Sequence, residues 1–344
     1  MKMLTRSDLR ILSFVLVGLS AVGVSAALAY ARMEAAPIGT GIVVIDTNLG
    51  YQDGAAAGSG MVLTSSGTVL TNNHVIAGAT TIKVVVPGTG HRYSAQVAGY
   101  DRTADVAVLR LKSASNLKTI SADTSRPSVG EPVKAVGNAG GTGSLTTARG
   151  TVIGLNRAIT ASDEQGSSEQ LTGMIETNAA VQPGDSGGPL LTRAGRVIGM
   201  DTAASANSQF AANASDAYAI PIGKALAIAA KVVTGHSSST IHIGATAFLG
   251  IEVENVVAGD GYGYGSPTSG ALVAGVVPGG PAANAGLVEG DVITAIAGHT
   301  ISSPTQISGV ILQRKPGQTV KVNYVDQYGN GYTTGVKLGS GPAQ

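Results

Sequence analysis

Short apolar runs separated by turn residues are the feature of this sequence that most restricts its fold. Runs of 3 to 9 residues recur along the first two thirds of the chain, with Gly, Pro, Asn or Ser residues between them. Such runs are typical of antiparallel strands joined by turns. We expect twelve strands, which suit two six-stranded barrels and a mainly β fold: 42–45, 61–64, 69–71, 82–86, 93–99, 106–111, 133–136, 147–155, 174–177, 190–192, 197–201 and 217–220.

A helix is expected to follow the last of these strands. Over residues 222–234 the apolar side chains that recur at helical spacing are Leu226, Ala229, Ala230 and Val233;. The run Gly-His-Ser-Ser-Ser-Thr that begins at Gly235 has the composition of a flexible linker;. The sequence therefore predicts a first domain over 35–235, a linker over 236–245 and a second domain over 246–340.

Residues 1–34 form a separate segment that predicts export. Residues 11–31 carry no charge and would span ~31 Å as a helix, close to the thickness of a bilayer core;. Lys2, Arg6 and Arg10 precede this stretch, which places the first ten residues in the cytoplasm and the bulk of the chain outside;. We expect an uncleaved single-pass anchor in the cell membrane. The alternative is a signal peptide cleaved near Ala29 and a secreted protein.

Composition excludes several classes of function. The formal net charge of +1 gives no electrostatic basis for binding nucleic acid;. The chain has no cysteine, so neither disulfides nor thiolate metal sites contribute;. His236 and His242 lie six residues apart without a carboxylate nearby, so neither a metal site nor a cofactor is predicted;.

The run from 182 to 190, Gln-Pro-Gly-Asp-Ser-Gly-Gly-Pro-Leu, is typical of a catalytic nucleophile. Ser186 lies among glycines, which let the backbone turn tightly, expose the hydroxyl and point neighbouring amide N–H groups toward one spot. A plain Gly/Pro/Ser turn at a strand edge is the alternative. The choice depends on whether the chain also supplies a base and a group that orients the base.

His74 and Asp105 fit these two roles. Of the five histidines, only His74 follows an apolar strand that ends in a polar turn. Asp105 opens the run 105–111, which is apolar on both alternating faces and predicts a strand buried on both sides;. A carboxylate at the end of such a strand needs a hydrogen-bonding partner, which the imidazole of His74 would supply. The residues therefore predict a catalytic triad of His74, Asp105 and Ser186.

The order of these three residues resembles that of the chymotrypsin-like serine proteases, and the fragments around them resemble the HtrA type among these. The matching fragments are Gly58-Ser59-Gly60-Met61-Val62, Thr71-Asn72-Asn73-His74-Val75-Ile76, Ala104-Asp105-Val106-Ala107-Val108-Leu109 and Gly184-Asp185-Ser186-Gly187-Gly188-Pro189. The resemblance covers roughly residues 40 to 340. It implies a chymotrypsin-like double six-stranded β-barrel with the triad between the barrels, followed by a PDZ domain.

The same resemblance implies where the oxyanion hole and the primary pocket lie. The oxyanion hole would form at Gly184, Asp185 and Ser186, with the amides of Gly184 and Ser186 as donors. The base of the primary pocket would be Ala180, with Thr202 and Tyr218 in its walls.

The uncharged pocket base predicts specificity. A buried cationic side chain would find no carboxylate at Ala180, so we expect cleavage after small or aliphatic residues rather than after Lys or Arg. Asp201 would contradict this expectation if it turned inward. Because Asp201 lies at a strand end, we expect its carboxylate to be solvated.

Asp185 departs from the resembled pattern, in which Asn often precedes the nucleophile. A buried carboxylate without a cation would be costly. We therefore expect one of two arrangements. Either an internal cation, Arg149 or Arg157, pairs with Asp185, or Asp185 stays partly solvated.

Residues 246–340 resemble the PDZ domain of the HtrA type. The run Phe248-Leu249-Gly250-Ile251 matches its carboxylate-binding loop, in which Gly250 lets successive backbone amides face the C-terminal carboxylate of a peptide;. The strand expected over 251–257 would accept that peptide as an added strand. A helix that starts at Pro304 would place Ile307 and Ile311 at the groove.

Two classes of function follow. The first is an extracytoplasmic serine endopeptidase that hydrolyses misfolded or signalling proteins in the cell envelope, as in protein quality control under stress. Its PDZ domain would capture the exposed C-termini of substrates or activators. Its other partners would be the membrane, through residues 11–31, and two further copies in a homotrimer, the assembly usual in the resembled family. The second class is a binding or chaperone-like protein with vestigial catalysis, against which the intact triad argues.

Overall fold

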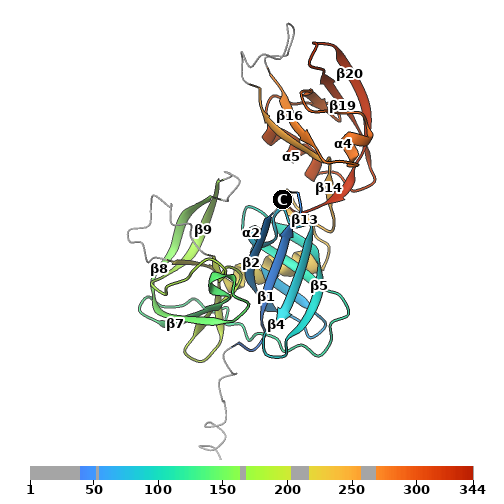
Figure 1. Ribbon diagram of the computed structural model, residues 1–344. Coiled ribbons are helices and arrows are strands. Elements are labelled where there is room, and N and C mark those ends of the chain that lie inside the picture. The colour runs from blue at the N-terminus through green and yellow to red at the C-terminus, as the bar shows by residue number, and fades with distance from the viewer. Residues whose placement is uncertain (1–38, 52–53, 163–167, 203–216, 257–268, 344) are drawn as a thin grey trace, which may run out of the picture. The chain divides into compact units, whose positions relative to one another are not determined.

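The computed structural model describes residues 39–51, 54–162, 168–202, 217–256 and 269–343 (Figure 1). The predicted N-terminal segment 1–34, with its membrane-spanning stretch 11–31, lies outside the described residues. Among the described residues, no helix is both long enough and apolar enough to cross a bilayer.

The first barrel follows the order β5-β4-β1-β2-β3-β6 and closes through a pairing of β5 with β6, with all neighbours antiparallel. A later strand, β13 (Ile241–Ile243), pairs with β5. Side chains such as Ile45, Val84 and Leu109 point inward and are fully buried. The six strands are β1 (Ile42–Leu49), β2 (Gly54–Val62), β3 (Thr68–Thr71), β4 (Thr81–Val86), β5 (His91–Asp101) and β6 (Val106–Leu111).

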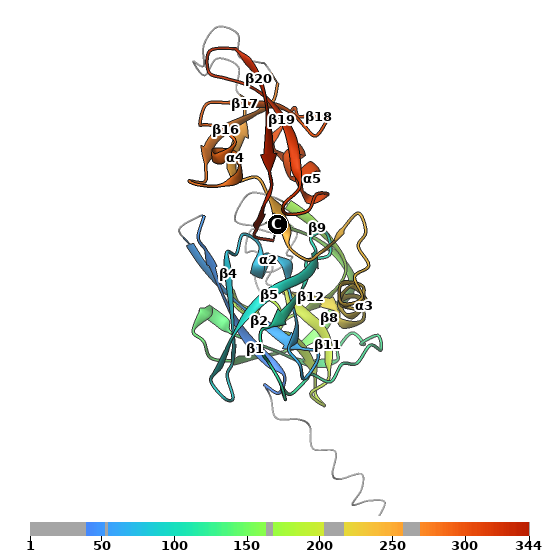
Figure 2. The ribbon, with the colours of Figure 1, turned by 90° about the vertical axis from the view of Figure 1, so that its right-hand side faces the viewer.

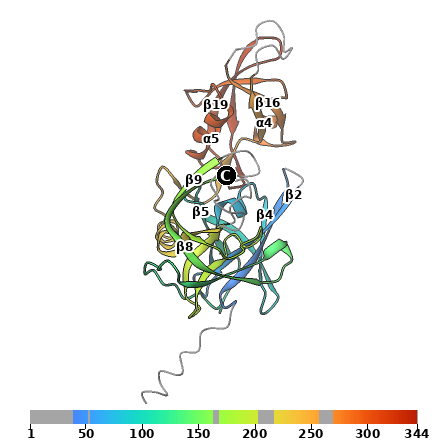
Figure 3. The same ribbon diagram turned by 90° about the vertical axis from the view of Figure 1, so that its left-hand side faces the viewer.

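The second barrel is closed in the order β10-β11-β12-β9-β8-β7. Figure 3 views the molecule from the side of its strands β8 and β9. Its interior holds apolar side chains from every wall, among them Val152, Ile175 and Leu190. Its strands are β7 (Pro132–Gly137), β8 (Thr146–Ser162), β9 (Ser168–Thr177), β10 (Pro189–Thr192), β11 (Val197–Thr202) and β12 (Ala217–Pro221).

One apolar cluster joins the two barrels. Met61 and Leu70 from the first barrel and Met200 and Ile220 from the second belong to it, and all four are fully buried. Burial of this kind is the main favourable contribution to folding, at roughly 1.5–3 kcal/mol for a side chain of this size. The barrels are therefore held side by side by a common core (Figure 2).

Helix α3 (Ile222–Val233) follows β12, as the sequence predicts. Its buried residues are Ile222, Ala225, Ile228, Ala229 and Val232, whereas Val233 is 49% exposed. Of the apolar residues that recur at helical spacing, Ala229 is buried and Leu226 packs partly buried against the core, while Ala230 is exposed. Helical spacing alone therefore does not distinguish one apolar stripe from the next.

The C-terminal domain has a five-stranded antiparallel path, β15-β16-β17-β19-β20, with β18 paired to β17 and a separate pair β14–β21. Ile293, Val322 and Val336 from the sheet pack against Ile307 and Ile311. The elements are β14 (Thr246–Phe248), β15 (Ile251–Asn255), β16 (Ala271–Val276), α4 (Pro281–Asn284), β17 (Val292–Ile296), β18 (His299–Thr300), α5 (Pro304–Leu312), β19 (Thr319–Val325), β20 (Gly331–Lys337) and β21 (Gly339–Gly341).

The predicted fold class is confirmed. Each of the twelve expected strands overlaps one of β1 to β12, and these strands form the two six-stranded barrels. Strand β15 ends at Asn255, two residues before the expected end. Ile307 and Ile311 are buried in the core of the C-terminal domain.

Candidate active site

His74 lies on the four-residue helix α2 (Asn73–Ile76), directly after β3. Val75 and Ile76 of this helix are buried in the first barrel, and they fix its orientation. The side chain of His74 is 39% exposed. The imidazole is therefore anchored by its own helix and still open on one side.

Asp105 lies at the start of β6 in a left-handed backbone conformation, with φ of 52°. Asp and Asn adopt this conformation more readily than other residues with a side chain. The side-chain amide of Asn72 donates to the carbonyl of Asp105 at 2.9 Å, and the Asp105 N–H donates to the carbonyl of Arg102 at 3.1 Å. These bonds hold the turn that presents the carboxylate.

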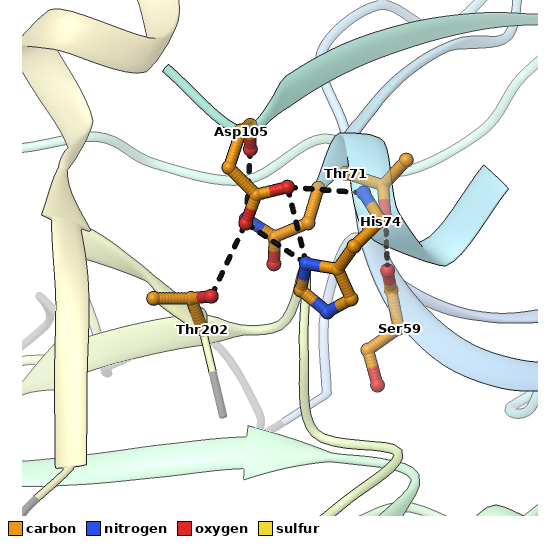
Figure 4. Close-up of polar contacts among 6 residues, drawn as sticks. Ser59, Thr71, His74, Asp105 and Thr202 are labelled. Carbon is orange, nitrogen blue, oxygen red and sulfur yellow. Dashed lines mark hydrogen bonds and ion pairs between the residues drawn. The ribbon is translucent and has the colours of Figure 1, made fainter. Parts of the chain in front are cut away.

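The Asp105 carboxylate accepts hydrogen bonds from three groups (Figure 4). His74 Nδ1 lies 2.9 Å from Oδ2, the His74 backbone N–H donates to Oδ1 at 3.0 Å, and the Thr202 hydroxyl donates to Oδ2 at 3.2 Å. Because a carboxylate only accepts, the ring proton of His74 belongs on Nδ1. Nε2 then remains to take up a proton.

The Ser186 loop has a backbone that only glycine allows at two positions. Gly184 and Gly187 have φ of +98° and +84°. A side chain at Gly184 would clash with the backbone oxygen of Asn138, and one at Gly187 would clash with that of Ser59. Glycine is therefore required at both positions, because of the positive φ and because the neighbouring backbone leaves no space for a side chain.

The end of β11 connects this loop to the Asp105 carboxylate. The Gly187 N–H donates to the carbonyl of Asp201 at 2.9 Å, and the Asp201 N–H donates to the carbonyl of Gly188 at 2.7 Å. The next residue along β11 is Thr202, whose hydroxyl reaches Asp105. The adjacent residues Asp201 and Thr202 thus fix the Ser186 loop and the Asp105 carboxylate relative to one another.

The amide of Gly184 is directed by its own peptide unit. The carbonyl of Pro183 accepts the Gly140 N–H at 2.8 Å, and a planar trans peptide points the Gly184 N–H the opposite way;. Within the described residues this N–H has no hydrogen-bond acceptor. The amide of Asp185, in contrast, donates to the carbonyl of Gln182 at 2.9 Å. The expectation that Asp185 belongs to the oxyanion hole is therefore wrong, because its N–H is used within the turn.

The residues expected at the primary pocket have different surroundings. Ala180 is exposed. The Thr202 hydroxyl is directed to Asp105, and the buried Tyr218 donates its hydroxyl to Glu176 Oε1 at 3.3 Å. Residues 203–216, which separate Thr202 from Tyr218 in the sequence, lie outside the described residues. The pocket stays a prediction.

Asp185 has neither of the two expected arrangements. Arg157 pairs with Glu176, Nε to Oε2 at 2.7 Å, while Arg149 is exposed and forms no ion pair among the described residues. Asp185 is only 3% exposed; its Oδ2 accepts the Gln182 N–H at 2.9 Å, and its buried Oδ1 forms no hydrogen bond that meets the same distance and angle limits among the described residues. Burial raises the pKa of Asp185, although N–H groups of Gln182 and Ala139 oppose the shift.

Asp201 is fully buried, which contradicts the expectation that it is solvated. Neither carboxyl oxygen has a hydrogen-bond partner among the described residues. Burial raises the pKa of Asp201 well above its ordinary value, and the nearby charge of Asp185 raises it further. The strand end at Asp201 is covered by the Ser186 loop, so a position that the sequence suggests is open to water is enclosed.

The expected peptide loop of the C-terminal domain begins at the end of β14. Gly250 has φ of +77°, and its carbonyl accepts the Val277 N–H at 3.0 Å. The carbonyl of Leu249 accepts the Ala282 N–H at 3.0 Å. In its sheet β15 pairs only with β16, so its other edge has no strand neighbour in the described sheet. The loop and the open edge are adjacent, as β-augmentation requires.

Comparison with known proteins identifies both domains. Residues 58–200 match the family model for the trypsin-like peptidase domain, and residues 247–327 match that for the PDZ domain. The chain is 32% identical to the serine protease Do-like HtrA of Lactococcus lactis subsp. cremoris over 83% of its own length and 71% of that protein. The chain belongs to the HtrA family of serine proteases.

Other serine proteases are similar to the chain over different shares of their length. Serine protease PepD of Mycobacterium tuberculosis is 34% identical over 89% of this chain, and the chain spans 65% of PepD. A probable periplasmic serine endoprotease, DegP-like, of Rhizobium meliloti is 30% identical over 84% of this chain and 54% of its own length. A solved structure of the HtrA-type protease AlgW with tripeptide is 28% identical, covers 90% of this chain and 96% of its own, and has a TM-score of 0.49.

For three residues of this site the sequence did not predict the contacts that the structure shows. Asn72, Thr202 and Ser59 contact the proposed triad or its loop through hydrogen bonds. Asn72 and Ser59 lie inside the fragments that resemble the HtrA type, but the fragments alone do not indicate what their side chains bond to. Thr202 was assigned to a pocket wall, and only the pairing of β11 with the loop reveals its hydroxyl at Asp105.

Asp201→Asn is expected to stabilise the protein at neutral and alkaline pH. The pKa of Asp201 is raised on folding, so its favourable effect is complete below the unfolded value of about 3.9 and is lost as pH rises through the folded value;. The variant should therefore match the original chain near pH 3.5 and exceed it in free energy of unfolding at pH 8, measured by urea denaturation. Asp46→Asn, at a partly exposed strand position, is the control. Equal stabilities of variant and original chain at both pH values would contradict the assignment.

Proposed function

We propose that the chain is an extracytoplasmic serine endopeptidase whose nucleophile is Ser186. The observation that carries the proposal is the bond between His74 Nδ1 and Asp105 Oδ2 at 2.9 Å. It sets the imidazole to act as a base, and β11 ties the same carboxylate to the Ser186 loop. Membership of the HtrA family supports this role.

In the first half of the reaction, the Ser186 hydroxyl attacks the carbonyl carbon of the peptide bond while His74 Nε2 takes its proton. The Asp105 carboxylate stabilises the imidazolium that forms and keeps its orientation. Negative charge develops on the substrate oxygen, and the N–H groups of Gly184 and Ser186 stabilise it. His74 then gives its proton to the leaving amine, and the acyl group stays on Ser186.

In the second half, water replaces the amine. His74 takes a proton from this water, hydroxide attacks the acyl carbon, and the oxyanion forms again at the same amides. Collapse of the intermediate releases the new carboxylate and returns the proton to Ser186. Neither half requires a metal or a cofactor.

The substrates proposed are misfolded or signalling proteins of the cell envelope, cleaved after small or aliphatic residues. The periplasmic naming of a DegP-like relative supports the location. Residues 11–31 would anchor the chain, with cleavage near Ala29 as the alternative. We further propose a homotrimer and a domain division at 35–235, 236–245 and 246–340. The PDZ domain would bind exposed C-termini at Phe248, Leu249, Gly250 and Ile251.

Ser186→Ala should lower kcat by roughly four to six orders of magnitude, because the remaining groups have no nucleophile to activate. A fluorophosphonate probe should label the original chain at Ser186 and leave the variant unlabelled, as read by peptide mass spectrometry. Ser66→Ala, at an exposed serine, is the control and should be labelled normally. A folded original chain that forms no adduct at Ser186 would favour the binding or chaperone-like class instead.

Cleavage of a peptide library should favour small or aliphatic residues before the cut bond. Ala180 offers no charge, and the carboxyl of Asp201 is buried away from solvent. Ala180→Asp should shift preference toward Lys and Arg, because a carboxylate at the base would pair with the cation. Dominant cleavage after Lys or Arg by the original chain would overturn the pocket assignment.

Peptides with a free C-terminal carboxylate should bind the PDZ loop, and the same peptides with an amidated C-terminus should bind at least about tenfold more weakly, because a charge-assisted hydrogen bond is lost. Gly250→Val should abolish the difference, since φ of +77° strains a β-branched residue and its Cβ would lie 3.2 Å from Pro281 Cδ;. Fluorescence anisotropy with labelled peptides measures both effects. Equal affinity for the two peptide forms would refute carboxylate capture at this loop.

A further inference from the structure

We propose that the buried hydroxyl of Ser59 is a positioning group for the oxyanion hole, holding the peptide unit between its two donor amides. This inference rests on the proposed function, because it assumes that Gly184 and Ser186 stabilise the oxyanion. Ser59 does not contact substrate in this role. It acts through the backbone of the Ser186 loop.

The four consecutive carbonyls from Pro183 to Ser186 all accept a hydrogen bond. The Gly140 N–H donates to Pro183 and the Gly188 N–H donates to Asp185, both at 2.8 Å. The carbonyls of Gly184 and Ser186, which alternate with these two along the chain, both accept hydrogen bonds from Ser59. Every peptide unit of the loop therefore has its direction set, and Ser59 sets two of the four.

Ser59 reaches the loop from the other barrel. It lies on β2 of the first barrel and is fully buried. Its hydroxyl donates to the Gly184 carbonyl at 2.8 Å, and its backbone N–H donates to the Ser186 carbonyl at 2.8 Å. The Thr71 hydroxyl donates to the Ser59 carbonyl at 2.7 Å, which fixes Ser59 itself (Figure 4).

The same hydroxyl also accepts a hydrogen bond. The Asn138 N–H donates to Ser59 Oγ at 2.9 Å, and Asn138 immediately precedes the short helix η1 (Ala139–Gly141). This helix supplies the Gly140 N–H that holds the Pro183 carbonyl. Ser59 Oγ thus joins the loop to the segment that directs the Gly184 N–H. A hydroxyl is suited to the position because it donates and accepts at once.

In the part of the chain that the structure describes, no other side chain donates a hydrogen bond to this peptide unit. Gly184 has no side chain and adopts φ of +98°, so its flanking peptides can rotate at little steric cost;. Asp185, which follows it, has no cationic partner among the described residues. The Ser59 hydroxyl is the one side-chain donor to a loop carbonyl within the part of the chain that the structure describes.

The decisive variant is Ser59→Ala, which leaves the Gly184 carbonyl and the Asn138 N–H without their partner. Because oxyanion stabilisation acts in the transition state, kcat should fall about 10- to 100-fold while KM stays within about twofold. Affinity for a peptidyl boronic acid, whose tetrahedral adduct places an oxygen in the oxyanion hole, should fall by the same factor as kcat/KM. The acidic limb of the pH profile, which reports His74, should not move.

Thr177→Val is the matched control. The Thr177 hydroxyl is also buried, donates to a carbonyl (Thr151, 2.9 Å) and accepts an N–H (Ala179, 3.1 Å), but it lies on β9 away from the loop. Loss of this hydroxyl should lower the melting temperature, as loss of the Ser59 hydroxyl should, but kcat should stay within about twofold of the value for the original chain. A merely structural role for Ser59 predicts the same outcome for both variants.

Ser59→Cys provides a second variant if Ser59→Ala fails to fold. A thiol keeps the side chain in place but is a weak donor and acceptor, so kcat should lie between the values for Ser and Ala. Unchanged kcat in a folded variant, or a fall in boronate affinity that Thr177→Val shares, would overturn the proposal. An original chain without activity or a Ser186 adduct would instead overturn the proposed function.

Discussion

The buried carboxylate of Asp105 is the constraint on which the rest of the site depends. A carboxylate at 5% exposure must be hydrogen-bonded, because an ionised group without partners in a protein interior is strongly unfavourable;. Two of its donors belong to His74 in the first barrel, and the third is Thr202 in the second. Satisfying this one group therefore fixes the imidazole tautomer and places the end of β11 against the first barrel.

The Ser186 loop, in contrast, is fixed through hydrogen bonds to its own backbone carbonyls and amides. Its glycines remove side chains where the backbone of Asn138 and Ser59 approaches, and its four carbonyls from Pro183 to Ser186 are all hydrogen-bonded. The carboxyls of Asp185, in the loop, and of Asp201, which bonds to it, have three buried oxygens without hydrogen-bond partners among the described residues. Burial favours the protonated form of both groups. Because the charge of Asp185 also raises the pKa of Asp201, ionisation of both carboxyls together is unfavourable;. The loop that presents Ser186 therefore rests on a pair of acids whose charge state depends on pH.

The local pattern predicted the strands well because each strand's alternation and flanking turns are encoded within a few residues. The same reasoning was less specific for α3: of the apolar residues at helical spacing, Ala229 is buried and Val233 is exposed, and the spacing did not single out Ala225, Ile228 and Val232, which are also buried. An apolar helix offers several equivalent stripes, and the neighbouring strands select one. Asp201 illustrates the same limit for a polar residue: a strand end is solvated only if no loop covers it.

The sequence by itself determined the mainly β architecture, the glycine-rich turn around Ser186 and the presence of a histidine and an aspartate suited to act with it. These are properties of residue type and of spacing over a few positions. Only the tertiary structure decided that Thr202 bonds to Asp105, 97 residues away, and that Ser59 bonds to Gly184, 125 residues away. The reason is physical: which buried donor meets which acceptor depends on how two closed barrels pack against one another, and no local pattern records that contact.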